Sequence, residues 1–321
     1  FSAYHLFSSW AYEWHLRTYP GVLAMSIDET LIDLSPKAER AVARQYMGRI
    51  QWEMILIGVG QSSIWIVTLV LTILGVFPLW LGFIITTLCM CMAYLPSHEG
   101  QHGNLSGRQE RWKWIDPLVG QISLLGLKQS HEALRVTHMK HHAHTNDPEL
   151  DTNYDARGDH WWQPALAVHR GEMENITRHA ERDPAFFESL VKGITLTKFL
   201  ALIQLVMVIL FPLETLLAWW LPSKLGLSYI YVYFAWEPHR LGTQTGRYTD
   251  TRFWTIPIPR FLCHSMQTHV IHHMYPTIPH WDEPKAMEAL RPFMIERGVP
   301  GAKQIPTRVR FNPLLGLTSS K

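Results

Sequence analysis

Long apolar runs alternate with polar stretches along this chain. The first run, residues 55–77, contains no charged residue, and a second, residues 79–95, follows it after Pro78 alone. A helix needs about 20 apolar residues to cross the hydrocarbon core of a bilayer. The two runs therefore predict a transmembrane hairpin.

A second pair of apolar runs lies further along the chain. Residues 194–211 include Lys198 near one end, and residues 213–236 include Glu214 and Pro222. We predict a second hairpin here, and we expect its last helix to be short, kinked or tilted. The pattern as a whole predicts four membrane spans.

Composition adds a polar part to this picture. The chain has 47% hydrophobic and 17% charged residues, yet its mean hydropathy is only -0.03. We therefore expect an all-α protein, a four-helix transmembrane bundle capped by a cytoplasmic helical domain. Residues 1–50 would form an N-terminal cytoplasmic or interfacial segment, residues 51–291 the membrane domain and residues 292–321 a cytoplasmic tail.

Basic residues flank the spans on one side only. They precede the first span, they are frequent from Arg108 to Arg182, and they follow the fourth span, at Lys37, Arg40, Arg44, Arg49, Arg240, Arg247, Arg252 and Arg260. Positively charged flanks stay in the cytoplasm. Both termini and the middle segment are thus predicted to be cytoplasmic, in the inner membrane if the source is bacterial.

Three histidine clusters lie on this cytoplasmic side. They are HEGQH, HMKHH and HVIHH, and they contain His98, His102, His138, His141, His142, His269, His272 and His273. Residues at i, i+3 and i+4 share one face of a helix, so each cluster can direct its imidazoles at one point. A random chain of this composition would contain HxxHH roughly 0.06 times. Surface or hydrogen-bonded core histidines do not explain the recurrence.

Eight ligands exceed the four that a closed zinc site uses, so two metal ions are the better interpretation. Imidazole binds iron, zinc and copper, and ligand type alone does not choose among them. Two carboxylates that follow the second cluster, Asp147 and Asp151, could accept the second ring N–H of a ligating histidine. A turn around Pro148 explains these two acids equally well.

The order of these clusters between the spans resembles the membrane fatty acid desaturase and hydroxylase superfamily. HMKHHAHTNDPELDTN and HVIHHMYPTIPHW are similar to sequences of bacterial desaturases and carotenoid hydroxylases. The resemblance covers about residues 40–291. It implies two non-haem irons, dioxygen as co-substrate and one further histidine ligand, which His239 in WEPHRLG matches.

Two positions bear on the branch of this superfamily. One branch has an asparagine four residues before the extra histidine, whereas this chain has Ala235; either the contact is absent or a neighbour such as Glu237 supplies it. The first cluster has three intervening residues, as in acyl-lipid desaturases and some carotenoid hydroxylases. An acyl-CoA substrate is therefore less favoured.

Three classes of function remain. The resemblance favours an O2-dependent acyl-lipid desaturase, and a carotenoid (β-carotene type) or lipid hydroxylase is the alternative. A non-enzymatic metal transporter or store is remote, because the spans contain almost no ionisable residue. Polar and small residues of the first span, such as Gly58, Gln61 and Ser62, could line a substrate tunnel, but helix packing explains them better.

Electrons must come from outside this sequence. It contains no GxGxxG fingerprint, no HPGG haem motif and no cysteine set for an iron–sulfur cluster. The expected partners are a long-chain lipid or carotenoid, membrane lipids, and a ferredoxin, rubredoxin or cytochrome b5 with its reductase. We expect no nucleic-acid partner.

Overall fold

In the computed structural model, three helices have the length and apolar composition needed to cross a membrane. They are α3 (Trp52–Ile73), the stretch Leu79–Gln101, which contains α4 (Leu79–Met92) and α5 (Tyr94–Gln101), and α10 (Pro184–Leu210). Three of the four predicted spans are confirmed on these grounds. The structure describes residues 33–171, 173–240, 243–255, 266–312 and 316–319; residues 1–32 of the predicted N-terminal segment, and Arg260, lie outside them.

The fourth predicted span is helical but divided. It contains α11 (Pro212–Thr215), the π segment η4 (Leu216–Trp220), α12 (Leu221–Ile230) and a second π segment, η5 (Tyr231–Trp236). Pro222 cannot donate a backbone hydrogen bond, and the helix widens just before it. No single piece is long enough to cross a bilayer, so the fourth span stays a prediction.

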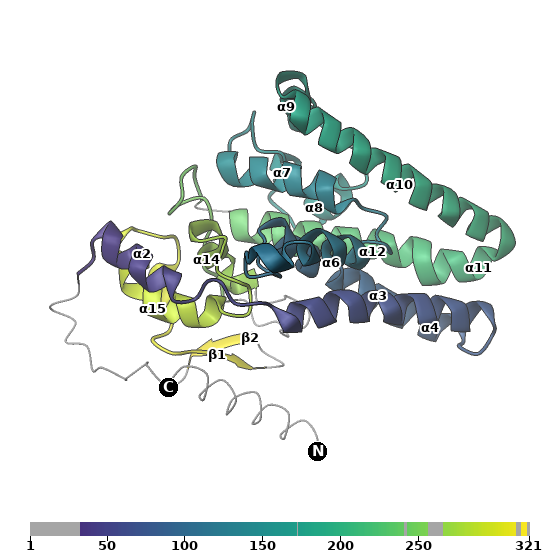
Figure 1. The fold of residues 1–321 in the computed structure, drawn as a ribbon, viewed down its shortest axis with the longest axis horizontal. Helices are drawn as coiled ribbons and strands as arrows, with labels where there is room; N and C mark the ends of the chain where they lie inside the picture. Colours follow the sequence, from purple (N-terminus) through teal and green to yellow (C-terminus); the bar gives the residue numbers. More distant parts are fainter. Residues whose placement is uncertain (1–32, 172, 241–242, 256–265, 313–315, 320–321) are drawn as a thin grey trace, which may run out of the picture. The chain divides into compact units, whose positions relative to one another are not determined.

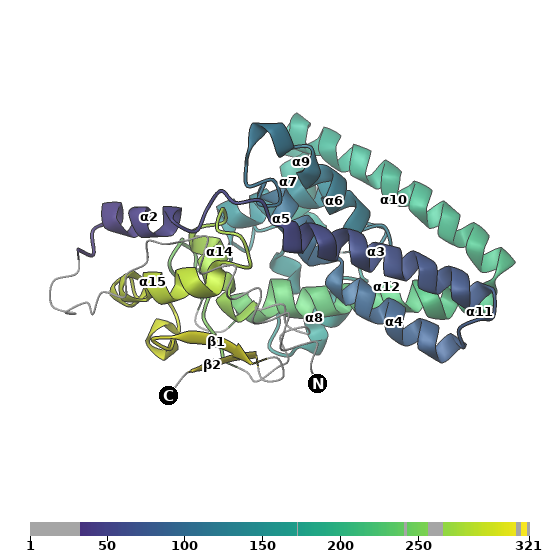
Figure 2. The same cartoon turned by 60° about the horizontal axis from the view of Figure 1, so that its bottom comes forward.

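Shorter helices lie before, between and after the spans (Figures 1 and 2). The α-helices are α2 (Pro36–Arg44), α6 (Ile115–Ser123), α7 (His131–His144), α8 (Trp162–Ala167), α9 (Glu174–Arg182), α14 (His269–Met274) and α15 (Glu283–Glu296). Short 3-10 turns are η2 (Glu110–Trp112), η3 (Tyr154–Ala156), η6 (Glu237–His239), η7 (Met266–Thr268) and η8 (Ala302–Gln304).

The prediction of a helical fold is confirmed, with one addition. In the C-terminal tail, β1 (Val309–Asn312) pairs antiparallel with β2 (Gly316–Ser319), and Val309 lies opposite Ser319. A strand of four residues carries too short a pattern to be recognised beside long apolar runs.

The apolar core joins the spans to the fourth helical stretch. Trp65 of α3 meets Trp219 of η4 with ring centroids 5.3 Å apart, and both are buried. Gly226 of α12 lets the helix approach Met90 of α4, because a Cβ at this glycine would lie 2.6 Å from the Met90 Cβ. The fourth stretch is therefore packed directly against the first hairpin.

The polar residues of α3 serve helix packing. Gln61 Nε2 donates to the Ser123 carbonyl at 2.8 Å, and Ser62 Oγ donates to the Ile122 carbonyl at 2.8 Å. A Cβ on Gly58 would lie 2.9 Å from both Pro96 and Val119. These contacts hold the end of α6 against α3.

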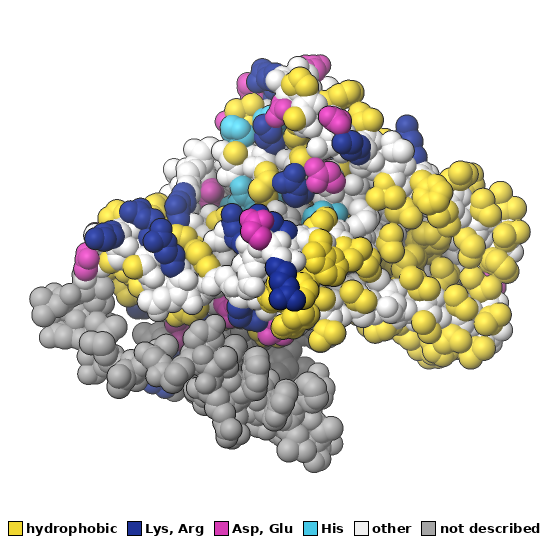
Figure 3. All heavy atoms as spheres, in the orientation of Figure 1, with side chains coloured by type: hydrophobic (Ala, Val, Ile, Leu, Met, Phe, Trp, Pro, Cys, Tyr) yellow, Lys and Arg dark blue, Asp and Glu magenta, His cyan; other side chains and the backbone are white. Residues whose placement is uncertain are grey.

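Large apolar side chains are exposed on α3, α4 and α10, as expected of helices that face lipid (Figure 3). In an 18-residue window of α10 only 11% of residues are buried, against 39% in α3. Charged side chains gather over the other elements.

Candidate metal centre

The nine predicted histidines come from four elements and meet in one place. His98 lies on α5 with His102 directly after it, His138, His141 and His142 lie on α7, His239 on η6, and His269, His272 and His273 on α14. Seven of them are buried, and His102 and His142 are half-buried. Ser130 begins α7 by accepting a hydrogen bond from the Ala133 N–H at 3.3 Å. Helices thus position the side chains of all three clusters.

Five of the imidazoles form a first group. Their ligand atoms lie within 4.8 Å of one another, and the group consists of His98, His102, His138, His142 and His272. The Nε2 atom of His138 is 2.9 Å from that of His102 and 3.0 Å from that of His142. The Nε2 atom of His142 is also 3.0 Å from that of His272. Such convergence of ring nitrogens is typical of a metal site.

Three further imidazoles, those of His141, His239 and His273, form a second group that meets the same distance limit. The two groups adjoin, because the rings of His142 and His273 lie with centroids 4.4 Å apart. His269 belongs to neither set but lies between them, with its ring centroid 5.0 Å from that of His272 and 4.9 Å from that of His273.

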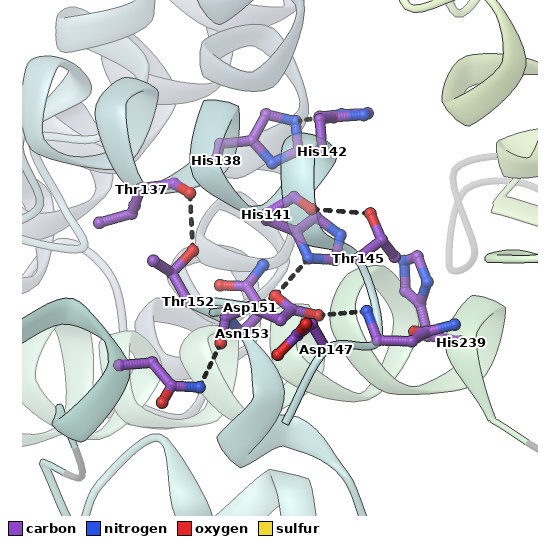
Figure 4. A network of polar contacts seen from close by, with 12 residues as sticks. Thr137, His138, His141, His142, Thr145, Asp147, Asp151, Thr152, Asn153 and His239 are labelled. Carbon is purple, nitrogen blue, oxygen red and sulfur yellow. Dashed lines mark hydrogen bonds and ion pairs between the residues drawn. The ribbon is translucent and has the colours of Figure 1, made fainter. Parts of the chain in front are cut away.

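Acceptors outside the groups fix two of these rings, and Figure 4 shows one of them, Asp151 beside His141. Asp151 Oδ1 lies 2.7 Å from His141 Nδ1, and the Asp250 carbonyl lies 2.9 Å from His239 Nδ1. A histidine that donates its Nδ1–H in this way presents Nε2 to a metal. Both Nε2 atoms are therefore available to the second group.

Asp147 lies elsewhere. Its Oδ1 accepts from the backbone N–H groups of Glu149 at 2.8 Å and Leu150 at 3.0 Å, so it stabilises the turn after α7. Of the two acids singled out in the sequence, only Asp151 contacts a clustered histidine.

Glu237 is occupied by arginines. Its carboxylate pairs with Arg240 Nε at 2.9 Å and also with Arg252. The structure therefore favours the interpretation in which Ala235 marks a missing contact that Glu237 does not replace.

Sequence reasoning missed Asp250. Besides its carbonyl contact with His239, its carboxylate oxygen lies 3.7 Å from His273 Nδ1, and burial raises its pKa to about 6. No sequence motif marks this residue, because it is brought to the centre by a turn beyond η6.

The electrostatics favour neutral imidazoles. The pKa is held well below the ordinary value, first by burial and then by electrostatic interaction with neighbouring groups, chiefly the other histidines, in His102, His138, His142, His239, His269, His272 and His273. Neutral imidazole is the form that binds metals.

The donor set also fits metal ions. Within the described part of the chain, both ring nitrogens of His98 and His273 and the Nε2 of His239 are buried without a hydrogen-bond partner. Buried polar atoms in this state are costly unless something binds them. A metal ion would bind one nitrogen of each of these three rings.

A largely apolar cavity of about 380 Å³ reaches the centre. It runs between α7, α10 and the end of the fourth helical stretch, and its walls include Leu134, Ile194 and Phe234. His98, His138, His141 and His269 line it, as do Ala235 and Lys198. A long apolar chain could lie here with one carbon next to the histidines.

Comparison with protein families gives one match, in which the sequence model described as fatty acid desaturase fits residues 74–302. That range includes the nine histidines and most of the chain.

Three curated proteins are similar at low identity. The zeaxanthin 4-ketolase of Chlamydomonas reinhardtii is 23% identical over 62% of this chain, which spans only 41% of the ketolase. The β-carotene ketolase of a Paracoccus species is 25% identical over 60% of this chain and 72% of its own length. The sn-1 oleoyl-lipid 12-desaturase of a Synechocystis species is 23% identical over 77% of this chain and 78% of its own length.

Proposed function

The chain belongs to the fatty acid desaturase family, and we propose that it is an O2-dependent, non-haem di-iron oxidoreductase of the membrane that inserts a double bond into a lipid acyl chain. The observation that carries this proposal is the convergence of nine imidazoles beside an apolar cavity. The coarser statement, that the protein is a membrane oxidoreductase, follows from the family and the apolar helices.

The first histidine group would hold one iron and the second group the other. We assign His269 to the second group, which has three members against five in the first. Two ferrous ions would supply the activation of dioxygen and the removal of hydrogen from an unactivated C–H bond, chemistry that redox-inactive zinc does not offer.

The residues of the chain hold and orient this centre. Asp151 and the Asp250 carbonyl direct His141 and His239 toward the second group. Phe234 and Leu134 line the cavity and exclude water from the substrate chain. The largely apolar walls of the cavity suit a hydrocarbon chain better than a polar substrate.

Topology forms part of the proposal. The divided stretch from Pro212 to Trp236 would complete a four-helix bundle, and the basic flanks would keep the histidine clusters in the cytoplasm. A ferredoxin, rubredoxin or cytochrome b5 with its reductase would supply two electrons for each turnover.

Desaturation is favoured because the desaturase relative aligns over the largest share of this chain. The second candidate is oxygenation of a carotenoid ring, and the specific observation for it is that two of the three relatives are carotenoid ketolases. Both reactions begin by removing hydrogen from carbon, so the histidine set serves either one.

The test is to express the chain with ferredoxin, its reductase and NADPH in membranes that contain both acyl lipids and β-carotene. Mass spectrometry of the extracts should show an acyl chain that has lost two hydrogens, and His272→Ala should abolish that product. A carotenoid that gains oxygen establishes the second candidate. An iron-loaded protein that changes neither substrate class contradicts both.

A further inference from the structure

A second pocket reaches the metal centre from another side. It has a volume of about 500 Å³ and its lining includes His142, His273, Asp250, Arg247 and Pro276. Neither of these two histidines lines the apolar cavity. We propose that this pocket and the basic surface beside it form the docking site of an acidic one-electron carrier protein, an inference that rests on the proposed function.

The lining of the pocket includes one member of each histidine group. His142 belongs to the first group and His273 to the second, and their ring centroids are 4.4 Å apart. His142 is only half-buried. A carrier placed at this opening would therefore lie next to ligands of both proposed irons.

One permanent cation, Arg247, lines the opening together with Asp147 and Asp250. Arg247 is exposed and lies over the Tyr275 ring at 4.4 Å from its centroid. Tyr275 Oη in turn donates to Glu39 Oε1 at 2.8 Å, and this buried carboxylate fixes α2 beside the pocket. The arginine and α2 thus belong to one connected surface.

The outer side of α2 extends the positive surface. Lys37, Arg40 and Arg44 are all exposed. Within the described residues, no carboxylate forms an ion pair with any of these three side chains or with Arg247. Cations without acidic partners attract an acidic protein and raise its association rate.

The position of α2 favours a soluble partner over the bilayer. Exposed apolar side chains gather on α3, α4, α10 and α11, and both ribbon views show α2 at the opposite end from α4 and α11. Figure 3 shows dark blue side chains over α2 and the yellow apolar surface at the other end. The cations therefore lie away from the surface that faces lipid.

The electrons balance with such a carrier. Each encounter oxidises one reduced carrier and delivers one electron to the enzyme, so two encounters serve one turnover. In desaturation, two electrons, two protons, one O2 and the two hydrogens lost from the acyl chain yield one alkene and two waters.

The test measures binding, which requires no turnover. A [2Fe–2S] ferredoxin is the probe, and the full chain is held in phosphatidylcholine nanodiscs. In Arg40→Glu/Arg44→Glu the association rate should fall roughly tenfold, and its dependence on salt should flatten. Arg182→Glu/Lys192→Glu, on α9 and α10, makes the same change in net charge and should bind within about twofold of the unchanged protein.

Arg247→Glu provides a second test on another element and should also slow association. Equal binding by all variants would overturn the docking site, even if ferredoxin-driven product forms. Normal docking without any product would instead contradict the proposed function, whereas the docking site would still stand. If charge reversal lowers the association rate only in nanodiscs that contain phosphatidylglycerol, the cations face anionic lipid and the proposal is wrong.

Discussion

Asp151 and His141 form a buried pair in which the carboxylate Oδ1 accepts the ring Nδ1–H at 2.7 Å. Backbone N–H groups of Asn146 and Asn153 donate to the same carboxylate at 2.8 and 2.9 Å. Burial alone would raise the pKa of Asp151, but His141 and these N–H groups outweigh it, and the pKa lies below its ordinary value. The carboxylate therefore stays ionised and holds His141 with Nε2 toward the second group.

Asp151→Asn should weaken metal binding. The amide can still occupy the space, but it no longer offers a charged acceptor, and loss of such a partner costs about 10- to 100-fold in metal affinity or activity. Iron content and product formation are the measurements. Asp147→Asn is the matched control, because Asp147 caps a turn and should leave iron content unchanged. Equal iron in both variants would show that the His141 contact has no role in metal binding.

Ligand substitutions should separate the two groups. His272→Ala removes a member of the first group and His239→Ala a member of the second, so each should lower the iron content toward one ion per chain and abolish turnover. His144→Ala is the control, since His144 follows the second cluster but stacks on His179 instead. Full iron content in His272→Ala or His239→Ala would refute the assignment of that residue.

Acid should destabilise the protein once its metals are removed by a chelator. The seven clustered histidines with lowered pKa stay neutral in the folded state, whereas in the unfolded chain they titrate near about 6.5. Above that pH neither state binds these protons. Below it the unfolded chain takes them up, and stability falls by up to about 1.4 kcal/mol per pH unit for each histidine.

Asp250 has the opposite effect, because its pKa is raised to about 6 and the folded state gains its proton first. The pKa of Asp116, Glu237 and Glu283 is also raised by burial, but these four carboxyls do not offset seven imidazoles. The unfolding temperature, measured from pH 8 to pH 5, should therefore decrease, and the iron-loaded protein should unfold at a higher temperature throughout. A flat profile for the metal-free protein would contradict the burial of neutral histidines.

Two glycines of the spanning helices should respond in opposite ways to alanine. A Cβ on Gly193 of α10 would lie 2.4 Å from the Ala133 Cβ of α7, so Gly193→Ala should cost about 1–3 kcal/mol and force the two helices apart. A Cβ on Gly60 of α3 would meet nothing within 4 Å, and Gly60→Ala should stabilise by up to about 1 kcal/mol. Thermal unfolding in detergent compares them, and equal effects would show that α10 does not pack closely on α7.

The sequence predicts the parts of this protein that rest on long or repeated patterns. The first predicted run, 55–77, corresponds to a helix at 52–73, and the third, 194–211, to a helix at 184–210 that begins ten residues earlier than predicted. The second continues through His98 to Gln101, so the spanning helix itself delivers the first cluster. Periodic histidines on a helix face likewise made the second and third clusters recognisable.

Contacts between distant segments could not be read from the sequence. The Asp250 carbonyl meets His239 through a turn, and Gln61 meets the Ser123 carbonyl across 62 positions. The π segments at 216–220 and 231–236 pack on other elements, the first on α4 and the second on α8. Such features follow from tertiary packing, which local pattern does not encode.

Few residues of α10 are buried by the rest of the protein, so the bilayer would help to set the shape of the cavity that α10 lines. α10 forms one wall, yet only 11% of its most apolar window is covered by protein. Its outer side must be supported by lipid tails, whose order and thickness set how closely the helix is pressed toward α7. Under the proposed function, lipid composition would then influence which substrates fit, and a bilayer of different thickness would reshape the cavity without any change in sequence.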